Sequence, residues 1–230
     1  MPLSRKVVLI AGATGPVGGR LIGAFSAAGA QLALCVRRLS DMPDMERTLK
    51  KLHTQALVIP CDLRFEEDVV RLVHRVIQRL GRIDVVVNAA SVVGPRLTVS
   101  DYPIEPWRNV FATNVTGTYL LCREVSPWMR RQGGGSIINV TSSMTATPQP
   151  QLGAYYVAAQ SIEGLTKLLA LELKDDGVRV NTIRLAEDAV LPDQEDPQPD
   201  WTRAFLWLAG DDSIATSGTR IATAEFATIS

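Results

Sequence analysis

The fold of this chain is decided near its start by the stretch Val7-Val8-Leu9-Ile10-Ala11-Gly12-Ala13-Thr14-Gly15-Pro16-Val17-Gly18. Five apolar residues in a row are typical of a strand that is buried on both faces of a parallel sheet. The glycines that follow permit a tight turn, and Pro16 suits the first turn of a helix because its φ angle is already helical. The stretch therefore predicts a strand, a glycine-rich turn and a helix.

The same alternation of strand and helix continues along the chain. Strands are expected at residues 6–11, 32–36, 57–59, 83–87, 136–141, 179–184 and 218–222. Helices are expected at residues 17–28, 43–53, 65–80, 105–131, 154–174 and 201–208. This rhythm predicts an α/β fold: a doubly wound parallel sheet with helices on both faces, forming a single domain over residues 1–230.

Composition narrows the possible partners. Lysine plus arginine and aspartate plus glutamate number 24 each, so the chain projects no strong field toward nucleic acid or an anionic membrane. The apolar run near the start is too short to span a bilayer. The three cysteines, Cys35, Cys61 and Cys122, are widely separated, which indicates neither a disulfide framework nor a metal site. We expect a cytoplasmic protein without a metal that binds neither nucleic acid nor membranes.

The glycine-rich turn is a candidate phosphate site. Free N–H groups at the start of the next helix can bind a pyrophosphate, and glycine lets the backbone approach it closely. An ordinary glycine-rich turn is the alternative. Pro16 lacks an N–H that would otherwise face phosphate, which predicts reduced affinity. Dinucleotide contacts are expected at Gly12, Thr14, Gly15, Val17 and Gly18.

The end of the second strand indicates which dinucleotide binds. Arg37 and Arg38 follow this strand, where the fold places either an acid for the ribose 2′-hydroxyl or an arginine for a 2′-phosphate. A guanidinium pairs well with phosphate, and no acid is present, so the pattern favours NADP over NAD. A solvated basic pair is the alternative interpretation.

Further motifs resemble those of the short-chain dehydrogenase/reductases, which have a Rossmann-type fold. Cys61-Asp62-Leu63 is similar to the segment of that family that contacts adenine, and Asp84-Val85-Val86-Val87-Asn88-Ala89-Ala90-Ser91 is similar to its D-x-x-x-N-N-A-G strand end. The resemblance implies cofactor contacts at Asp62, Leu63, Asn88 and Ala90.

The catalytic motifs of that family have counterparts further along. Asn114 resembles the helix asparagine that anchors a water in a proton relay. Ser143 ends a segment that resembles the catalytic serine strand, and Tyr156 follows it at the family interval of thirteen residues. The resemblance implies that Ser143 holds the substrate oxygen and that Tyr156 transfers a proton, while hydride passes between the nicotinamide and a carbon of the substrate.

One residue that the resemblance requires is missing. The family pattern Tyr-x-x-x-Lys reads Tyr156-Val157-Ala158-Ala159-Gln160 here, and a frame that starts at Tyr155 ends on Ala159. The lysine lowers the pKa of the tyrosine and binds the nicotinamide ribose. Gln160 can donate hydrogen bonds to the ribose but cannot supply the charge.

Two other differences affect the same end of the cofactor. Leu185-Ala186 stands where the family has Pro-Gly followed shortly by a threonine that engages the nicotinamide. The substrate lid is shortened to about residues 186–200, an acidic stretch rich in proline, which predicts poor exclusion of water.

Two hypotheses follow. The first is an NADP-dependent oxidoreductase with weak or atypical activity on a small carbonyl or alcohol substrate, using Ser143, Tyr156, Asn114 and Gln160. The second is a catalytically silent subunit that binds NADP and regulates or accompanies an active relative. The apolar helix at 154–174 and the helix at 105–131 resemble the family's interface helices, which predicts a homodimer or homotetramer, or a hetero-oligomer with such a relative.

Overall fold

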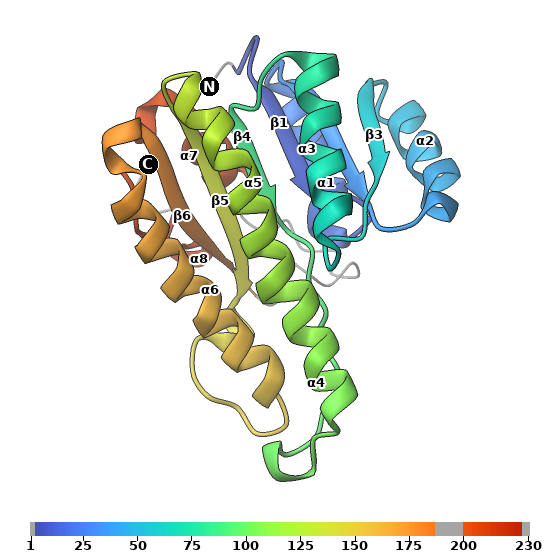
Figure 1. Ribbon diagram of the computed structural model, residues 1–230, viewed down its shortest axis with the longest axis vertical. Helices are drawn as coiled ribbons and strands as arrows, with labels where there is room; N and C mark the ends of the chain where they lie inside the picture. Colours follow the sequence, from blue (N-terminus) through green and yellow to red (C-terminus); the bar gives the residue numbers. More distant parts are fainter. Residues whose placement is uncertain (1–2, 187–199, 227–230) are drawn as a thin grey trace.

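The computed structural model describes residues 3–186 and 200–226. Its centre is a seven-stranded sheet in the order β3-β2-β1-β4-β5-β6-β7, and each neighbouring pair is parallel (Figure 1). The strands are β1 (Val7–Ala11), β2 (Gln31–Val36), β3 (Ala56–Pro60), β4 (Val85–Asn88), β5 (Gly135–Ser142), β6 (Val178–Leu185) and β7 (Arg220–Ala222). The doubly wound α/β fold is therefore confirmed.

Helices cover both faces of the sheet (Figure 1). They are α1 (Pro16–Ala27), α2 (Met42–Lys51), α3 (Glu66–Leu80), α4 (Ile104–Val110), α5 (Gly117–Arg131), α6 (Gly153–Glu172), α7 (Thr202–Ala209) and α8 (Thr223–Phe226). Helices α1, α2 and α7 pack on one face, and α3, α5 and α6 pack on the other. Since the chain winds from β1 outward to β3 and then returns to place β4 beside β1, a crevice is expected at the carboxyl ends of β1 and β4.

Strand β1 shows why the opening apolar run forms the middle of the sheet. Val8 and Ile10 face the core beneath α1 and α7, whereas Val7, Leu9 and Ala11 face the core beneath α3 and α5. All five side chains are buried. A strand with both faces covered needs apolar residues at every position, which is the pattern that the sequence shows.

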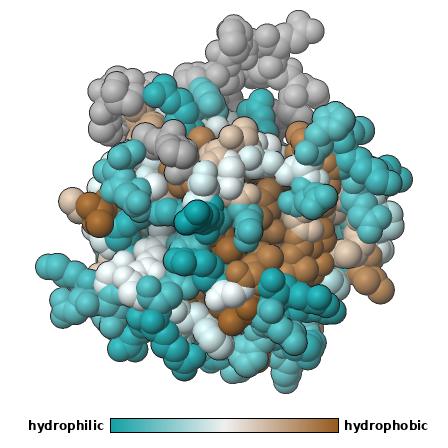
Figure 2. Space-filling view, turned by 90° about the horizontal axis from the view of Figure 1, so that it is seen from above, coloured by the Kyte–Doolittle hydropathy of each residue, from teal (hydrophilic) through white to brown (hydrophobic). Residues whose placement is uncertain are grey.

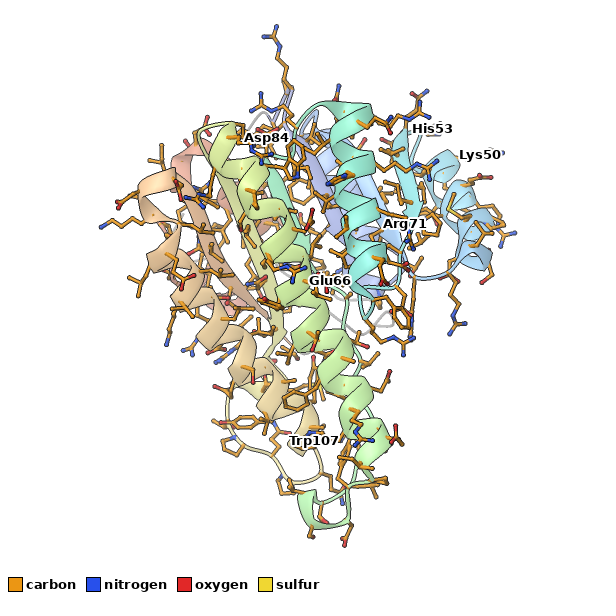
Figure 3. The ribbon with its side chains drawn as sticks, in the orientation of Figure 1. Lys50, His53, Glu66, Arg71, Asp84 and Trp107 are labelled. Atoms are coloured by element: carbon orange, nitrogen blue, oxygen red, sulfur yellow. The ribbon has the colours of Figure 1, made fainter. Side chains whose placement is uncertain are left out.

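The long helix expected at 105–131 is not one regular helix. Helix α4 is followed by a π-helical segment, Phe111–Thr116, before α5 begins. Figure 3 shows Trp107 of α4 at the opposite end of the molecule from Asp84, and its ring stacks on Phe111 with 5.0 Å between centroids. The apolar periodicity predicted a helix correctly, but it could not reveal one wider turn, which is a common feature of functional sites.

Two expectations from the sequence concern a membrane span and the substrate lid. Within 3–186 and 200–226, no helix is both long and apolar enough to cross a bilayer. Residues 187–199, which make up nearly all of the expected shortened lid, lie outside the part of the chain that the structure describes.

Candidate functional site

The glycine-rich turn lies at the carboxyl end of β1, in the crevice between β1 and β4. Gly12 has a φ of +81°, and a Cβ atom there would lie 2.6 Å from the backbone nitrogen of Ala90. A Cβ on Gly18 would lie 2.4 Å from the carbonyl oxygen of Gly12. Both positions therefore require glycine. Gly15 caps α1, so the N–H groups of the first turn of α1 open toward the crevice.

A cavity of about 60 Å³ lies beside this turn. Of the residues expected to contact the cofactor, six line it: Gly12, Thr14, Arg37, Asp62, Leu63 and Ala90. Cys61, from the segment that resembles the adenine-contacting one, also lines it, as do Cys35 and Thr113, which were not expected from the sequence. The hydroxyl of Thr113 is buried and has no hydrogen-bond partner among the described residues. A polar ligand in this cavity would be able to satisfy it.

Charges at this cavity are organised around Asp62. Nη2 of Arg64 lies 2.6 Å from Oδ2 of Asp62, and Nε of Arg37 lies 3.6 Å from the same oxygen. The hydrogen bonds from Arg64 hold the pKa of Asp62 below its usual range, and Arg37 adds to this effect. Two guanidinium groups against one carboxylate leave a net positive charge, which suits an anionic ligand.

The other residues expected at the cofactor do not line this cavity; they are Gly15, Val17, Gly18 and Asn88. Val17 is buried in the core beneath α1, and Gly18 serves the packing of the turn. Asn88 ends β4, and its Nδ2 donates to Oδ1 of Asn139 at 2.8 Å. Asn88 lines a second, smaller cavity on the far side of Ala90 rather than the first one.

This second cavity contains the candidate proton donor. It lies between the ends of β4 and β5 and the first half of α6. Its lining residues are Asn88, Ala90, Ser91, Asn114, Thr118, Val140, Thr141, Tyr155, Ala159 and Ile162. Burial raises the pKa of Tyr155 above that of a free phenol, and hydrogen bonding with the side chains of Ser91 and Ser142 opposes the rise. The hydroxyl of Tyr155 therefore lies close to the hydroxyl of Ser91, which lines the cavity, and to that of Ser142 next to it.

The residues brought together differ by one position from those expected. Ser142 and Tyr155 meet here, and they are separated by the same thirteen residues as Ser143 and Tyr156. Ser143 begins a short 3₁₀ turn after β5. Neither serine lines the cavity, so Ser142 is placed beside it by its hydrogen bonding with Tyr155, whereas Tyr156 does not line the cavity. The residue four positions after Tyr155 is Ala159, whose methyl group forms part of the cavity wall.

Gln160, which was expected as a ribose ligand, bonds to the loop after β5. Its Nε2 donates a hydrogen bond to the carbonyl oxygen of Thr145 at 3.1 Å. This bond ties α6 to the turn that follows Ser142. Gln160 therefore fixes the loop after the strand, and it is not among the residues that line the cavity.

Asn114 reaches the cavity as expected. It lies in the π-helical segment, where its Oδ1 accepts from the backbone nitrogen of Val92 and its Nδ2 donates to the carbonyl oxygen of Val92, both at 2.9 Å. The pair holds the segment after β4 against the irregular turn. The wide turn thus provides a rigid wall on the side of the cavity opposite β5.

Sequence reasoning missed a buried ion pair one helical turn beyond Ala159. Nη2 of Arg184 lies 2.5 Å from Oε1 of Glu163, and Nη1 of Arg220 lies 3.2 Å from the other carboxylate oxygen. Arg184 immediately precedes Leu185-Ala186, the dipeptide that stands where Pro-Gly was expected. Leu185 is buried in the core, and the backbone nitrogen of Ala186 donates to Oγ1 of Thr223 at 3.1 Å.

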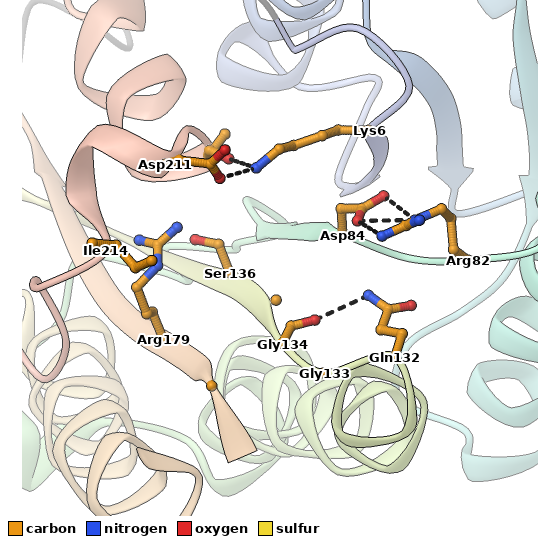
Figure 4. A pocket seen from close by; sticks show the side chains of 13 residues that line it. Lys6, Arg82, Asp84, Gln132, Gly133, Gly134, Ser136, Arg179, Asp211 and Ile214 are labelled. Atoms are coloured by element: carbon orange, nitrogen blue, oxygen red, sulfur yellow. Dashed lines mark hydrogen bonds and ion pairs between the residues drawn. The ribbon is translucent and has the colours of Figure 1, made fainter. Parts of the chain in front are cut away.

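Other cavities lie at the amino ends of the strands, and one of about 230 Å³ is drawn in Figure 4. Four of its charged side chains form two pairs, Lys6 with Asp211 and Arg82 with Asp84, each at 2.6 Å. The guanidinium of Arg179, which also lines the cavity, donates to the carbonyl oxygen of Leu208 and to the hydroxyl of Ser213. Figure 2 views the molecule from this upper side, where hydrophilic side chains surround an apolar area. Ligands of doubly wound folds bind at the opposite, carboxyl ends. We therefore assign these pairs to fastening the loops.

The sequence and the fold resemble those of known proteins. The family model described as short chain dehydrogenase matches residues 6–187. A Bos taurus protein, Dehydrogenase/reductase SDR family member 4, is 34% identical over 182 residues, which cover 79% of this chain and 65% of that protein. An Oryctolagus cuniculus L-fucose dehydrogenase is 35% identical over 178 residues, covering 77% of this chain and 61% of that protein.

A crystal structure of NAD+-bound xylitol dehydrogenase superimposes with a TM-score of 0.85 at 25% identity, covering 96% of this chain and 98% of that one. The aligned part of this chain spans less than two thirds of the two sequence relatives. The structural match, in contrast, covers nearly the whole of both chains.

Proposed function

The chain belongs to the short-chain dehydrogenase family, and we propose that it binds NADP(H) and transfers hydride slowly between this cofactor and a carbonyl or alcohol substrate. One observation carries the proposal: Tyr155 and Ser142 meet beside the cofactor crevice, but Ala159 stands where the family has lysine. The site retains a proton donor and lacks the charge that makes it efficient.

We call the cavity beside Gly12, Arg37 and Asp62 the adenosine end. Here the N–H groups of α1 would bind the pyrophosphate, and Arg37 would pair with a 2′-phosphate. Arg37 already lies 3.6 Å from Asp62, so its guanidinium is held at the mouth of the cavity. The exposed fraction of its side chain is 39%, which leaves donors available for a phosphate. These features support NADP over NAD.

We call the cavity beside Ser142, Tyr155 and Ala159 the nicotinamide end. The nicotinamide cofactor supplies or accepts the hydride. Ser142 would donate a hydrogen bond to the substrate oxygen, and Tyr155 would deliver a proton to it during reduction. Reduction then consumes one hydride and one proton and yields an alcohol.

In alcohol oxidation, the reverse reaction, Tyr155 has no positive charge to assist it among the described residues that line its cavity. It must then act as a base, and burial raises its pKa. A neutral phenol is a weak base near neutral pH. Loss of one preorganised charge costs roughly 3 kcal/mol in the transition state, or about a hundredfold in rate. The site is therefore better suited to reduction than to oxidation.

A catalytically silent, NADP-binding subunit is the second candidate. Ala159 and the buried Leu185 favour it, because both residues alter the nicotinamide end while the adenosine end stays complete. Such a subunit would bind the cofactor and turn nothing over.

The two candidates are separated by a matched pair of variants. Oxidation of NADPH is followed with a panel of ketones and aldehydes, using the unmodified protein, Tyr155→Phe and Tyr156→Phe. We expect slow oxidation that Tyr155→Phe abolishes and Tyr156→Phe leaves nearly unchanged. Equal activity in all three would rule out Tyr155 as the proton donor. No activity in any of them, with NADPH binding intact, would establish the silent subunit.

We further propose a homodimer or homotetramer through α5 and α6. Leu168 and Leu171 on α6 are 53% and 75% exposed, although Ile162 on the same helix is buried. Large apolar side chains clustered on one surface indicate an interface. Light scattering at micromolar concentration should give the mass of a dimer or tetramer, and Leu168→Asp with Leu171→Asp should shift it to that of a monomer. A monomeric mass for the unmodified protein would refute the interface.

A further inference from the structure

The cavity at the nicotinamide end has a size and a lining that suit one small polar species. Its volume is about 20 Å³. Roughly 10–15 Å³ is enough to hold a water molecule, so the cavity accommodates one species of that size. Ala159 forms part of the wall, and its short side chain leaves this space on the same helical face as Tyr155.

Two buried oxygen atoms of lining residues lack partners. Oδ1 of Asn88 and Oγ1 of Thr141 accept no hydrogen bond from any described residue. Their residues are only 5% and 6% exposed. The Nδ2 of Asn88 donates to Oδ1 of Asn139 at 2.8 Å, which leaves Oδ1 of Asn88 as the unpaired atom. Unpaired buried acceptors are costly, so a species in the cavity that both residues line is expected to satisfy them.

The charge of the lining also selects the species. Among the described residues that line the cavity, Tyr155 is the only ionisable side chain, and none of them is basic. Amide and hydroxyl oxygens are ligands for hard monovalent cations such as potassium, and they also accept hydrogen bonds from ammonium. A cation beside Tyr155 would favour its ionised form.

We propose that this cavity binds one monovalent cation of potassium or ammonium size, held by Asn88 Oδ1 and Thr141 Oγ1, in the space that Ala159 leaves beside Tyr155. The cation supplies from solution the charge that the chain lacks. The inference rests on the proposed function in one respect, namely that Tyr155 is the proton donor. The alternative species is a water molecule, which satisfies the same oxygens without a charge.

The coupling between cation and tyrosine makes the site measurable without cofactor or substrate. If the cation lowers the pKa of Tyr155, ionisation of Tyr155 must strengthen cation binding by the same factor. An opposite charge within about 4–6 Å commonly shifts a pKa by 1–3 units. We expect a fall of about one unit, which is a tenfold larger tyrosinate population at a given pH.

The experiment is an ultraviolet titration of tyrosinate in KCl and in tetramethylammonium chloride at equal ionic strength. Subtracting the titration of Tyr155→Phe isolates Tyr155 from the other tyrosines, and circular dichroism at each pH confirms that the protein stays folded. The midpoint of Tyr155 should be lower in KCl. An identical midpoint in the two salts would leave water as the occupant and overturn the proposal.

Three variants locate the effect. Thr141→Val removes one proposed ligand and should reduce the potassium shift. Thr113→Val removes a hydroxyl that is equally unpaired but lines the adenosine end, so the shift should persist. Ala159→Lys should lower the pKa of Tyr155 in both salts and abolish the difference between them. A potassium shift that survives Ala159→Lys would place the cation elsewhere.

A second measurement is made at neutral pH, where alkaline unfolding of the protein does not interfere. A ligand that binds only the folded state raises the thermal midpoint in proportion to its binding. At neutral pH, KCl should raise the midpoint above that in tetramethylammonium chloride for the unmodified protein and Thr113→Val, and less for Thr141→Val and Ala159→Lys. The same rise of the thermal midpoint in all four proteins would show that potassium acts as a general salt effect, and it would overturn the proposal.

Discussion

The adenosine end and the nicotinamide end of the crevice differ in how completely their charges are arranged. At the adenosine end, Arg37 and Arg64 both lie beside Asp62, so the cluster of these three side chains has a net positive charge. At the nicotinamide end, Tyr155 meets neutral hydroxyl groups, and the position four residues later is Ala159. Both ends lie at the carboxyl ends of the strands of one sheet. The difference in charge between them therefore comes from individual side chains and not from the fold.

The difference teaches that cofactor binding and hydride transfer depend on separate groups in this fold. Binding draws on the helix N–H groups and on arginine, whereas the rate depends on a charge beside the tyrosine. Loss of the charge beside the tyrosine leaves the groups that bind the cofactor in place. A chain of this kind can therefore retain its cofactor after most of its chemistry has been lost.

Restoring the charge at the nicotinamide end should have the largest effect. Ala159→Lys is expected to raise NADPH-dependent carbonyl reduction by up to about a hundredfold, or ~2.7 kcal/mol, because an ammonium beside Tyr155 stabilises developing negative charge. Steady-state oxidation of NADPH measures the gain.

Two controls accompany this variant. Gln160→Lys puts the same charge one position further along α6, where the side chain now bonds to Thr145, and should give little gain. Ala159→Lys combined with Tyr155→Phe should give none. A larger gain in reduction rate from Gln160→Lys than from Ala159→Lys would indicate that Ser143 and Tyr156, and not Ser142 and Tyr155, are the reacting pair.

A change at the adenosine end should alter selectivity and not rate. Arg37→Asp is expected to weaken NADPH binding by about tenfold relative to NADH, or ~1.4 kcal/mol, because it removes the partner of the 2′-phosphate. Calorimetric titration with both cofactors measures the ratio. Arg38→Asp is the matched control, since it changes the same charge at the next position. Equal losses of NADPH affinity in the two variants would show that the effect comes from the overall charge of the surface and not from a contact with the 2′-phosphate.

The smallest effect concerns acid stability. Hydrogen bonding from Arg64 lowers the pKa of Asp62, so the pair stabilises the fold above the unfolded-state pKa of about 3.9 and loses this contribution as pH falls through the lower, folded-state pKa. Asp62→Asn should cost about 1 kcal/mol near neutral pH, and the gap should close in acid. Urea unfolding at both conditions measures it. A gap that stays constant with pH would point to packing instead of charge.

The sheet could be predicted from the sequence because its strands are buried on both faces. Runs such as Val7–Ala11 and Val85–Asn88 are apolar at nearly every position, and turns rich in glycine separate them from helices. The π-helical segment at Phe111–Thr116 could not be predicted, because one extra residue in a turn leaves the apolar pattern almost unchanged. Asn114 was still identified, since its motif is local.

The frame of the active residues could not be decided from spacing. Ser142 and Ser143 are adjacent, as are Tyr155 and Tyr156, so both pairs satisfy the interval of thirteen residues. One residue rotates a side chain about 100° around a helix, which decides whether it faces the sheet. A signal was present in the sequence of α6. The frame of Tyr155 continues through Ala159, Ile162 and Thr166, none of which is charged, whereas that of Tyr156 continues through the polar or charged Gln160, Glu163 and Lys167.

The most direct test of the contrast between the two ends measures both on one sample of the unmodified protein. Calorimetry with NADPH and NADH tests the adenosine end, and NADPH oxidation with a carbonyl panel tests the nicotinamide end. We predict that NADPH binds in preference to NADH and is oxidised slowly, at a rate that rises when Ala159 is replaced by lysine. Failure to bind NADPH, or rapid oxidation that the lysine does not increase, would contradict the account.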